Sequence, residues 1–176
     1  MKPASRFMPK YEPKKANKLA LFVLLSIFIA ILIYKPIYIA IITLLVLLVI
    51  VWSKIEQPKI DTYFEKMREE RQGLSICEFA KEFDKQTVDT WVIRAAYEQL
   101  QAALPTKHTV PIKASDNLYD VLKLDEEDLD LDLVEEIAQR TGRSLENYEN
   151  NPYFGKVTTA CNLVLFFNHQ ASTNAS

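Results

Sequence analysis

The sequence contains few residues of the kinds that build metal sites, disulfides and tight turns. Its 176 residues include three glycines, two cysteines (Cys77 and Cys161) and two histidines (His108 and His169). No Cys-x-x-Cys pair occurs, so these residues do not match the spacing of a structural zinc site. We therefore expect no metal site and no cofactor. The scarcity of glycine and the absence of alternating polar and apolar runs predict an all-α fold.

Both cysteines fall in apolar stretches with helical spacing, Ile76–Ala80 and Ala160–Leu163. A buried, unreactive thiol is the usual role of cysteine in such a position. Two unpaired thiols agree with a reducing compartment, whereas a disulfide between them would require a fold outside the cytoplasm.

What the sequence does contain is a long apolar run over residues 19–52, interrupted only by Lys35 and Pro36. One straight helix of that length would span about 50 Å, whereas the hydrocarbon core of a bilayer is about 30 Å thick. Pro36 has no amide hydrogen, disfavours helical geometry at Lys35 and suits the first turn of a new helix. We therefore expect a transmembrane hairpin made of helices over 19–34 and 37–52.

The ends of the two apolar halves carry residues suited to a membrane interface. Each half is only about 24 Å long as a helix, so flanking lysines would extend toward the head groups and aromatic rings would lie at the interface. The residues that we expect at the membrane interface are Lys18, Tyr34, Lys35, Tyr38, Trp52 and Lys54.

Basic residues flank the apolar run on both sides. Six Lys and Arg and one acid precede it, net plus five; Lys54, Lys59, Lys66 and Arg68 follow it, and only Lys35 lies between. The positive-inside rule then predicts a multi-pass protein with both termini in the cytoplasm. A re-entrant hairpin would also keep both ends on one side, whereas a single span would place the folded region outside. A cleaved signal peptide fits less well, because no small-x-small site ends the run.

The rest of the chain is acidic. From Ser53 onward there are fourteen Lys and Arg against twenty-two Asp and Glu, net minus eight. Nucleic-acid binding needs a basic face, so we expect no nucleic-acid partner. The basic cytoplasmic tail over 1–18, and not the acidic domain, should contact anionic lipid head groups.

Beyond the apolar run, apolar residues recur at helical spacing. Four of them between Ile60 and Met67 share one face, which predicts an amphipathic linker helix over 53–73. A helical domain over 74–170 and a disordered tail over 171–176 follow.

Within the helical domain, four segments carry helix signals. The first is a short helix opened by a capping box, the second covers 87–103, the third is acid-rich and ends before a glycine, and the last covers about 159–168. The aromatic residues Trp91 and Tyr97 match the apolar stripe of the second helix, and we expect them in the core. The expected capping residues are Ser75, Gly142 and either Thr158 or Thr159.

Part of this domain resembles a known family. Ser115–Asp125, the helix end at Arg140–Gly142, and Lys156–Thr159 followed by an apolar helix to Phe166 are similar to acyl carrier proteins and, more narrowly, to a bacterial carrier-like family of unknown function. The resemblance covers about residues 91–170. It implies a carrier-like helical fold, which the predicted hairpin would hold at the bacterial inner (cytoplasmic) membrane.

The resemblance fails at the position that defines carrier activity. In carriers a serine at the start of the second helix bears a phosphopantetheine arm, but the matching stretch here, 124–130, contains no serine. Ser115 and Ser144 precede helical starts and are interpreted as caps or turn residues. We therefore expect no prosthetic group.

Carriers also dock basic patches of enzymes through an acidic second helix, and the matching segment here is strongly acidic. Such a density of carboxylates is self-repelling and indicates a partner with a basic surface, although a solvated acidic face is an open alternative. The expected partner-docking residues are Asp125, Glu126, Glu127, Asp128, Asp130, Asp132, Glu135 and Glu136.

The same segment also imitates the first ligands of a calcium loop at Asp128, Asp130 and Asp132. However, Leu133 replaces the glycine at position six and Gln139 replaces the glutamate at position twelve. We expect no calcium site.

No nucleophile, histidine or oxyanion device accompanies the carboxylates, so we expect that the protein is not an enzyme. We predict a membrane-anchored interaction or regulatory protein whose acidic domain docks a basic protein partner, in support of envelope integrity or antibiotic tolerance. The alternative is a membrane-associated acyl or lipid carrier. A weaker one is a helix pair that assembles with other transmembrane helices, for which Ala40 and Thr43 offer little small-residue packing.

Overall fold

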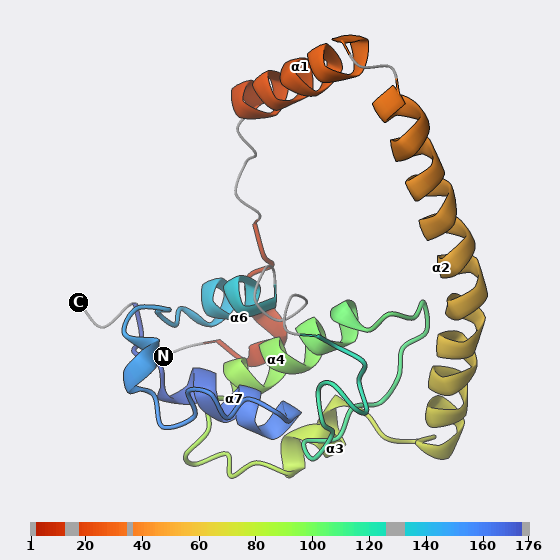
Figure 1. The fold of residues 1–176 in the computed structure, drawn as a ribbon. Coiled ribbons are helices and arrows are strands. Elements are labelled where there is room, and N and C mark those ends of the chain that lie inside the picture. The colour runs from red at the N-terminus through yellow and green to blue at the C-terminus, as the bar shows by residue number, and fades with distance from the viewer. Residues whose placement is uncertain (1–2, 13–17, 35–36, 126–132, 174–176) are drawn as a thin grey trace. The chain divides into compact units, whose positions relative to one another are not determined.

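The computed structural model describes residues 3–12, 18–34, 37–125 and 133–173. In this part of the chain the regular structure is helical (Figure 1), and strand pairing is limited to isolated bridges of Asn117 with Thr159 and of Arg143 with Ser172. The predicted all-α class is thereby confirmed for the described residues.

The chain divides into two compact units. The apolar unit is Glu12–Thr62, and the helical unit combines Met1–Tyr11 with Tyr63–Ser176. The helical unit therefore contains residues from before and after the apolar run, which the sequence alone did not indicate.

The apolar unit contains helix α1 (Lys18–Tyr34) and most of helix α2 (Ile37–Glu70). The bounds of α1 and the start of α2 match the prediction to within one residue. Leu, Ile, Val and Ala dominate both segments, and in a run without Gly or Pro their side chains are compatible with a continuous helix. The antiparallel pairing of the two helices as a hairpin remains a prediction.

Helix α2 continues past Trp52, where the sequence predicted the end of the apolar span. Pro58 lies inside the helix although proline has no amide donor, and the Thr62 hydroxyl donates to the carbonyl of Pro58 (2.8 Å). The change from apolar to amphipathic composition therefore falls inside one helix. The predicted span over 37–52 and most of the linker over 53–73 are one continuous element.

A short connection with a positive φ of 85° at Gly73 follows α2 and leads into helix α3 (Ile76–Lys81). The Ser75 hydroxyl accepts a hydrogen bond from the amide of Cys77 (3.2 Å) and donates one to the carboxylate of Glu78 (2.5 Å). The bond from Ser75, with a second from Lys81, lowers the pKa of Glu78. Ser75 is confirmed as the cap of this helix.

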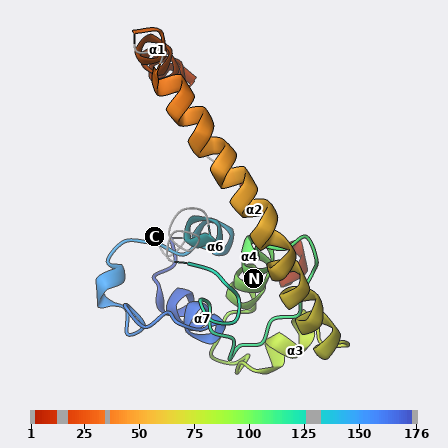
Figure 2. The ribbon, with the colours of Figure 1, turned by 45° about the vertical axis from the view of Figure 1, so that its right-hand side comes forward.

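Helix α4 (Thr90–Ala103) lies at the centre of the helical unit, in contact with α3, α6 and α7 (Figures 1 and 2). It begins three residues later than predicted, because Asp89 is the cap and accepts from the amide of Trp91 (2.9 Å). Tyr97 is buried as predicted, whereas Trp91 is half-buried. The buried stripe of α4 consists of Val92, Ile93, Ala95, Ala96, Tyr97 and Leu100.

Helices α6 (Val134–Thr141) and α7 (Ala160–His169) pack against α4, with the short η3 turn (Tyr148–Asn150) between them in the chain. Gly142 ends α6 with φ 65° and ψ 38°, a left-handed conformation that glycine adopts without strain. Thr159 caps α7 by accepting from the amide of Asn162 (3.2 Å). Both predicted helix ends are confirmed, and Thr159 rather than Thr158 is the cap.

The N-terminal segment (residues 3–11) belongs to the helical unit and includes the short η1 turn (Ser5–Phe7). The indole of Trp91 donates to the carbonyl of Pro3 (2.8 Å), Nε of Arg94 donates to the Ser5 hydroxyl (3.2 Å), and Met8 is buried. The predicted basic tail over 1–18 therefore contains a segment that packs on α4.

The C-terminal residues are also attached to the helical unit. The amide of Ser144 donates to the carbonyl of Ala171 (2.8 Å), and the amide of Thr173 donates to the carbonyl of Gly142 (2.8 Å). The predicted disordered tail over 171–176 thus starts too early, because Ala171 and Thr173 are hydrogen-bonded to residues just after α6. Residues 174–176 lie outside the described part.

Candidate functional site

The described side chains of α1, and those of α2 as far as Lys59, are exposed in the structure, although most are large and apolar. Helix α2 is long and apolar enough to cross a bilayer, and α1 is a shorter apolar helix. The Ser26 hydroxyl of α1 donates to the carbonyl of Phe22 (2.8 Å), so this polar group is satisfied within the helix. Apolar surface on this scale is unfavourable in water and suits a bilayer.

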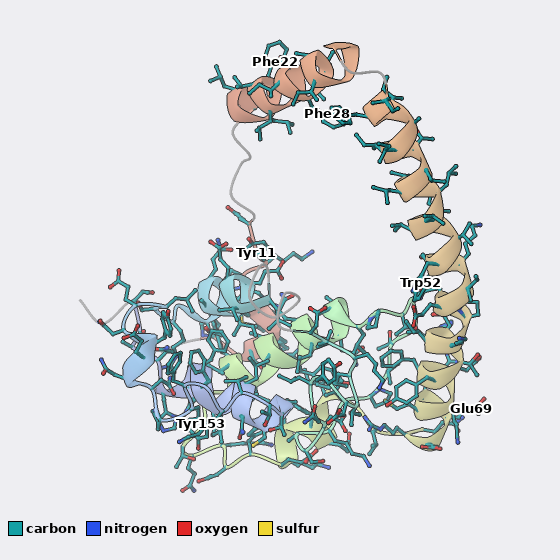
Figure 3. All side chains as sticks on the ribbon, viewed as in Figure 1. Tyr11, Phe22, Phe28, Trp52, Glu69 and Tyr153 are labelled. Carbon is teal, nitrogen blue, oxygen red and sulfur yellow. The ribbon has the colours of Figure 1, made fainter. Side chains whose placement is uncertain are left out.

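The predicted interface residues lie at the ends of the apolar segments. Tyr34 closes α1, and its side chain lies outside the described part, as does Lys35. The indole of Trp52 donates a hydrogen bond to the carboxylate of Glu56 one turn later (Figure 3 labels Trp52). An apolar ring with a satisfied polar edge is typical of tryptophan at a membrane interface. The exposed members of the predicted set are Lys18, Tyr38, Trp52 and Lys54.

The acidic segment is described only in part. Glu135 and Glu136 lie in the first turn of α6 and are half-buried, and Asp125 is exposed. Carboxylates in a first turn are stabilised by the helix dipole, which gives these two glutamates a structural role in addition to the predicted docking. The predicted docking residues outside the described part are Glu126, Glu127, Asp128, Asp130 and Asp132.

The sequence predicts no metal ion at the calcium-like motif, and the structure leaves this prediction open. The three aspartates of the calcium-like motif lie outside the described residues. Among the residues that the structure does describe, no three or more His, Cys, Asp or Glu side chains come together in a way that could hold a metal ion.

A buried ion pair that the sequence analysis missed holds a loop in the helical unit. Nη1 and Nη2 of Arg71 donate to the two carboxylate oxygens of Asp116 (2.6 and 2.9 Å), and Arg71 also donates to the carbonyl of Pro111 (2.8 Å). Asp116 is 5% exposed and accepts from the amide of Lys113 (2.8 Å). The Asp-Asn dipeptide at 116–117 is a turn signal, but nothing local identifies Arg71 as its partner.

A second arginine, Arg143, joins three segments that are distant in the sequence. It donates to the carbonyls of Asn168 (3.2 Å) and Gln170 (2.8 Å), and its Nη2 lies 3.4 Å from the carboxylate of Asp89. The backbone amide of Asp89 donates a hydrogen bond to the side-chain oxygen of Asn168 (2.9 Å). These bonds tie the end of α6 to the start of α4 and the end of α7, so they are structural.

The two cysteines differ from the prediction and from each other. Both are free; Cys77 is exposed and Cys161 is half-buried. Cys77 was predicted to be buried, but Phe79 occupies the core-facing position of α3, and a residue two positions away on a helix points to the opposite side. Burial raises the pKa of the Cys161 thiol, and the nearby Glu82 carboxylate raises it further.

The described geometry therefore combines an apolar unit suited to a bilayer with a helical unit tied together by one buried and one half-buried ion pair. Comparison with protein-family models, with curated proteins and with solved structures finds no match for this chain.

Proposed function

We propose that this chain is a non-enzymatic interaction or regulatory protein of the bacterial inner membrane. In this proposal α1 and α2 form a hairpin anchor, and the helical unit is a carrier-like domain that docks a protein partner with a basic surface. Both termini are cytoplasmic. The proposal is supported by the connectivity of the helical unit, by the charge distribution and by the acidic segment.

The observation that carries the anchor is that both flanks of the apolar helices belong to one unit. The flank before α1 is hydrogen-bonded to Trp91 and Arg94. On the other flank, Phe64 and Met67 are buried. Because one packed unit cannot be divided by a bilayer, both flanks fit the same side of the membrane. This favours a two-span or re-entrant hairpin over a single span.

The charge distribution supports the cytoplasmic side. The first eighteen residues are net plus five, and basic flanks are retained in the cytoplasm during insertion. The remainder from Ser53 onward is net minus eight, which favours encounter with a partner of positive surface potential.

Docking is tested by crosslinking in membranes followed by affinity purification of the full-length chain. The test variant reverses Asp128, Asp130 and Asp132 to Lys, and the matched control reverses the exposed residues Glu69, Glu146 and Glu149 to Lys. Both variants must insert and fold like the wild type. We expect a partner that is lost only in the test variant. If all three chains retain the same partners, the acidic segment is a solvated face and the docking proposal fails.

The carrier alternative requires a covalent arm or a bound lipid. Because the segment over 124–130 has no serine, the intact mass of the purified protein should equal that of its sequence. A phosphopantetheine adduct would favour the carrier instead. A role in the envelope further predicts that loss of the protein changes permeability to detergents or antibiotics, and unchanged sensitivity would count against it.

A further inference from the structure

A groove of about 430 Å³ lies on the helical unit between η1, α3 and α4. Its volume is within the range of about 300–1,000 Å³ found for small-molecule sites. Ile76, Ala80 and Ile93 contribute apolar surface to it, and of these Ile93 is buried. The groove thus has an apolar floor.

The charged side chains of this groove are basic. Lys81, Lys85 and Arg94 line it, and no acidic side chain is among its described lining residues. This local charge is opposite to that of the chain from Ser53 onward, which is net minus eight. A basic groove in an acidic domain would attract an anion to this one face.

Two of these three cations have carboxylate partners that are not among the lining residues of the groove. Nε of Arg94 donates to the Ser5 hydroxyl (3.2 Å), which fixes the guanidinium beside η1, and Nη1 donates to Glu98 (2.9 Å). Glu98 also accepts from Arg140, so two arginines share one carboxylate. Lys81 pairs with Glu78 (3.2 Å), and an exposed pair of this kind is weak.

We propose that this groove binds the phosphate of an anionic phospholipid head group in the inner leaflet. Guanidinium and ammonium groups are the donors that proteins use for phosphate, and the apolar floor suits the glycerol and first methylene groups beside it. The charge complementarity is local, so it is compatible with an acidic domain. Binding would hold the helical unit at the membrane surface.

A head group is favoured over a soluble phosphate because the groove is tethered near the bilayer. Ser5, which lines it, lies thirteen residues before Lys18, the first residue of α1. A chain of that length spans about 45 Å at most, and tethering raises the effective concentration of head groups. This step rests on the proposed membrane anchor.

The groove contains its own reporter, because the exposed thiol of Cys77 lines it. The full chain, with Cys161→Ala so that one thiol remains, is placed in nanodiscs of phosphatidylcholine alone or mixed with phosphatidylglycerol. The rate of Cys77 alkylation by the neutral reagent N-ethylmaleimide is then measured. We expect alkylation about fivefold slower with phosphatidylglycerol, as produced by a ligand at about four times its dissociation constant.

Two double variants make the test specific to the groove. Lys81→Gln with Lys85→Gln should abolish the protection, whereas Lys107→Gln with Lys113→Gln removes the same charge from exposed positions outside the groove and should retain it. Each rate is compared between the two nanodiscs for the same variant, so a change in the basal reactivity of Cys77 cancels. Matched unfolding temperatures show that the variants fold.

Each other outcome overturns the proposal. Equal rates in the two nanodiscs, or equal protection in both double variants, exclude binding in the groove. Protection by inorganic phosphate in phosphatidylcholine nanodiscs that matches the effect of phosphatidylglycerol assigns the groove to a soluble phosphate instead. Carbonate extraction of the wild type from cell membranes tests the anchor separately. An inserted chain without protection contradicts only the groove, whereas an extracted chain contradicts the anchor as well.

Discussion

Arg71 and Asp116 are 45 positions apart in the sequence and form a bidentate, nearly dry ion pair. Removing one partner of such a pair leaves the other charged and buried, which costs about 3–5 kcal/mol. We expect Asp116→Asn to lower the free energy of unfolding of the helical unit by about this amount, because Arg71 would lose its counter-charge. Pulse proteolysis of the full-length chain in urea, in detergent, measures the change.

The control for this prediction is an exposed ion pair in the last turn of α2, close to Arg71 in the sequence. Nζ of Lys66 lies 3.9 Å from the carboxylate of Glu70, and both side chains are more than half exposed. Glu70→Gln should cost less than about 1 kcal/mol. Similar losses for Glu70→Gln and Asp116→Asn would contradict the role assigned to the buried pair.

The two thiols should react at different rates. The thiolate is the form that attacks N-ethylmaleimide, and the raised pKa of the Cys161 thiol keeps its thiolate a minor species at neutral pH. We expect Cys77 to be modified several-fold faster than Cys161 in the folded protein. The rate at Cys161 should continue to rise as the pH moves from neutral to alkaline. Peptide mass spectrometry after timed labelling measures both sites, and equal rates would show that Cys161 is not protected by the fold.

Single-residue roles were predictable where they depend on close neighbours. Ser75, Gly142 and Thr159 act on amides or carbonyls within a few residues, so the local sequence identified Ser75 and Gly142 and narrowed the third cap to Thr158 or Thr159. Arg71 and Arg143 act on partners 45 and 54 positions away or on distant carbonyls, and no local pattern specifies these pairs. The role of Asp116 as the partner of Arg71 is therefore visible only in the fold.

Helix α7 offers a test of capping in which the neighbouring residue is the control. Thr159 accepts from the amide of Asn162, whereas Thr158 is exposed and lies one residue before the cap. Replacing a threonine cap by alanine costs about 1 kcal/mol, because a helix amide loses its partner. We expect Thr159→Ala to destabilise the helical unit by this amount and Thr158→Ala to have little effect, in the same urea assay. The opposite order would move the cap to Thr158.

The helices differ in how well their bounds could be predicted. The start of α7 and the end of α6 coincide with strong local signals, a threonine cap and a glycine. The start of α4 was misplaced, because Thr87 resembles a cap as closely as Asp89 does and only the fold distinguishes them. The continuity of α2 was missed because composition changes at Ser53, although every residue from there to Glu70 except Pro58 tolerates a helix.

At the scale of the whole molecule, the proposed topology predicts which positions are reached from outside the cell. Lys35→Cys should be labelled by a membrane-impermeant maleimide in intact spheroplasts if two spans cross the bilayer. The native Cys77, which is exposed on the helical unit, should be labelled only after permeabilisation. Green fluorescent protein fused to either terminus should fluoresce, because it folds in the cytoplasm.

Each labelling result that contradicts the two-span topology favours a different alternative. Labelling of Cys77 in intact spheroplasts would place the helical unit outside and favour a single span. Labelling of neither position before permeabilisation would favour a re-entrant hairpin, which shares the cytoplasmic termini.

At this scale the sequence could predict the apolar helices and the charge bias. It could not predict that residues 3–8 pack on α4, because a single methionine in a basic segment does not indicate a buried position.

Docking of the N-terminal segment on α4 also sets an order of events during synthesis. Trp91 lies 88 positions after Pro3, so the ribosome needs about 4–18 s to reach it at about 5–20 residues per second. During that time both apolar helices emerge, while the surface that receives Met8 does not yet exist. In the proposed topology, the first residues therefore remain on the ribosome side of the membrane until α4 has been made. If that topology holds, the contacts of residues 3–8 with α4 then stabilise an arrangement that membrane insertion has already set.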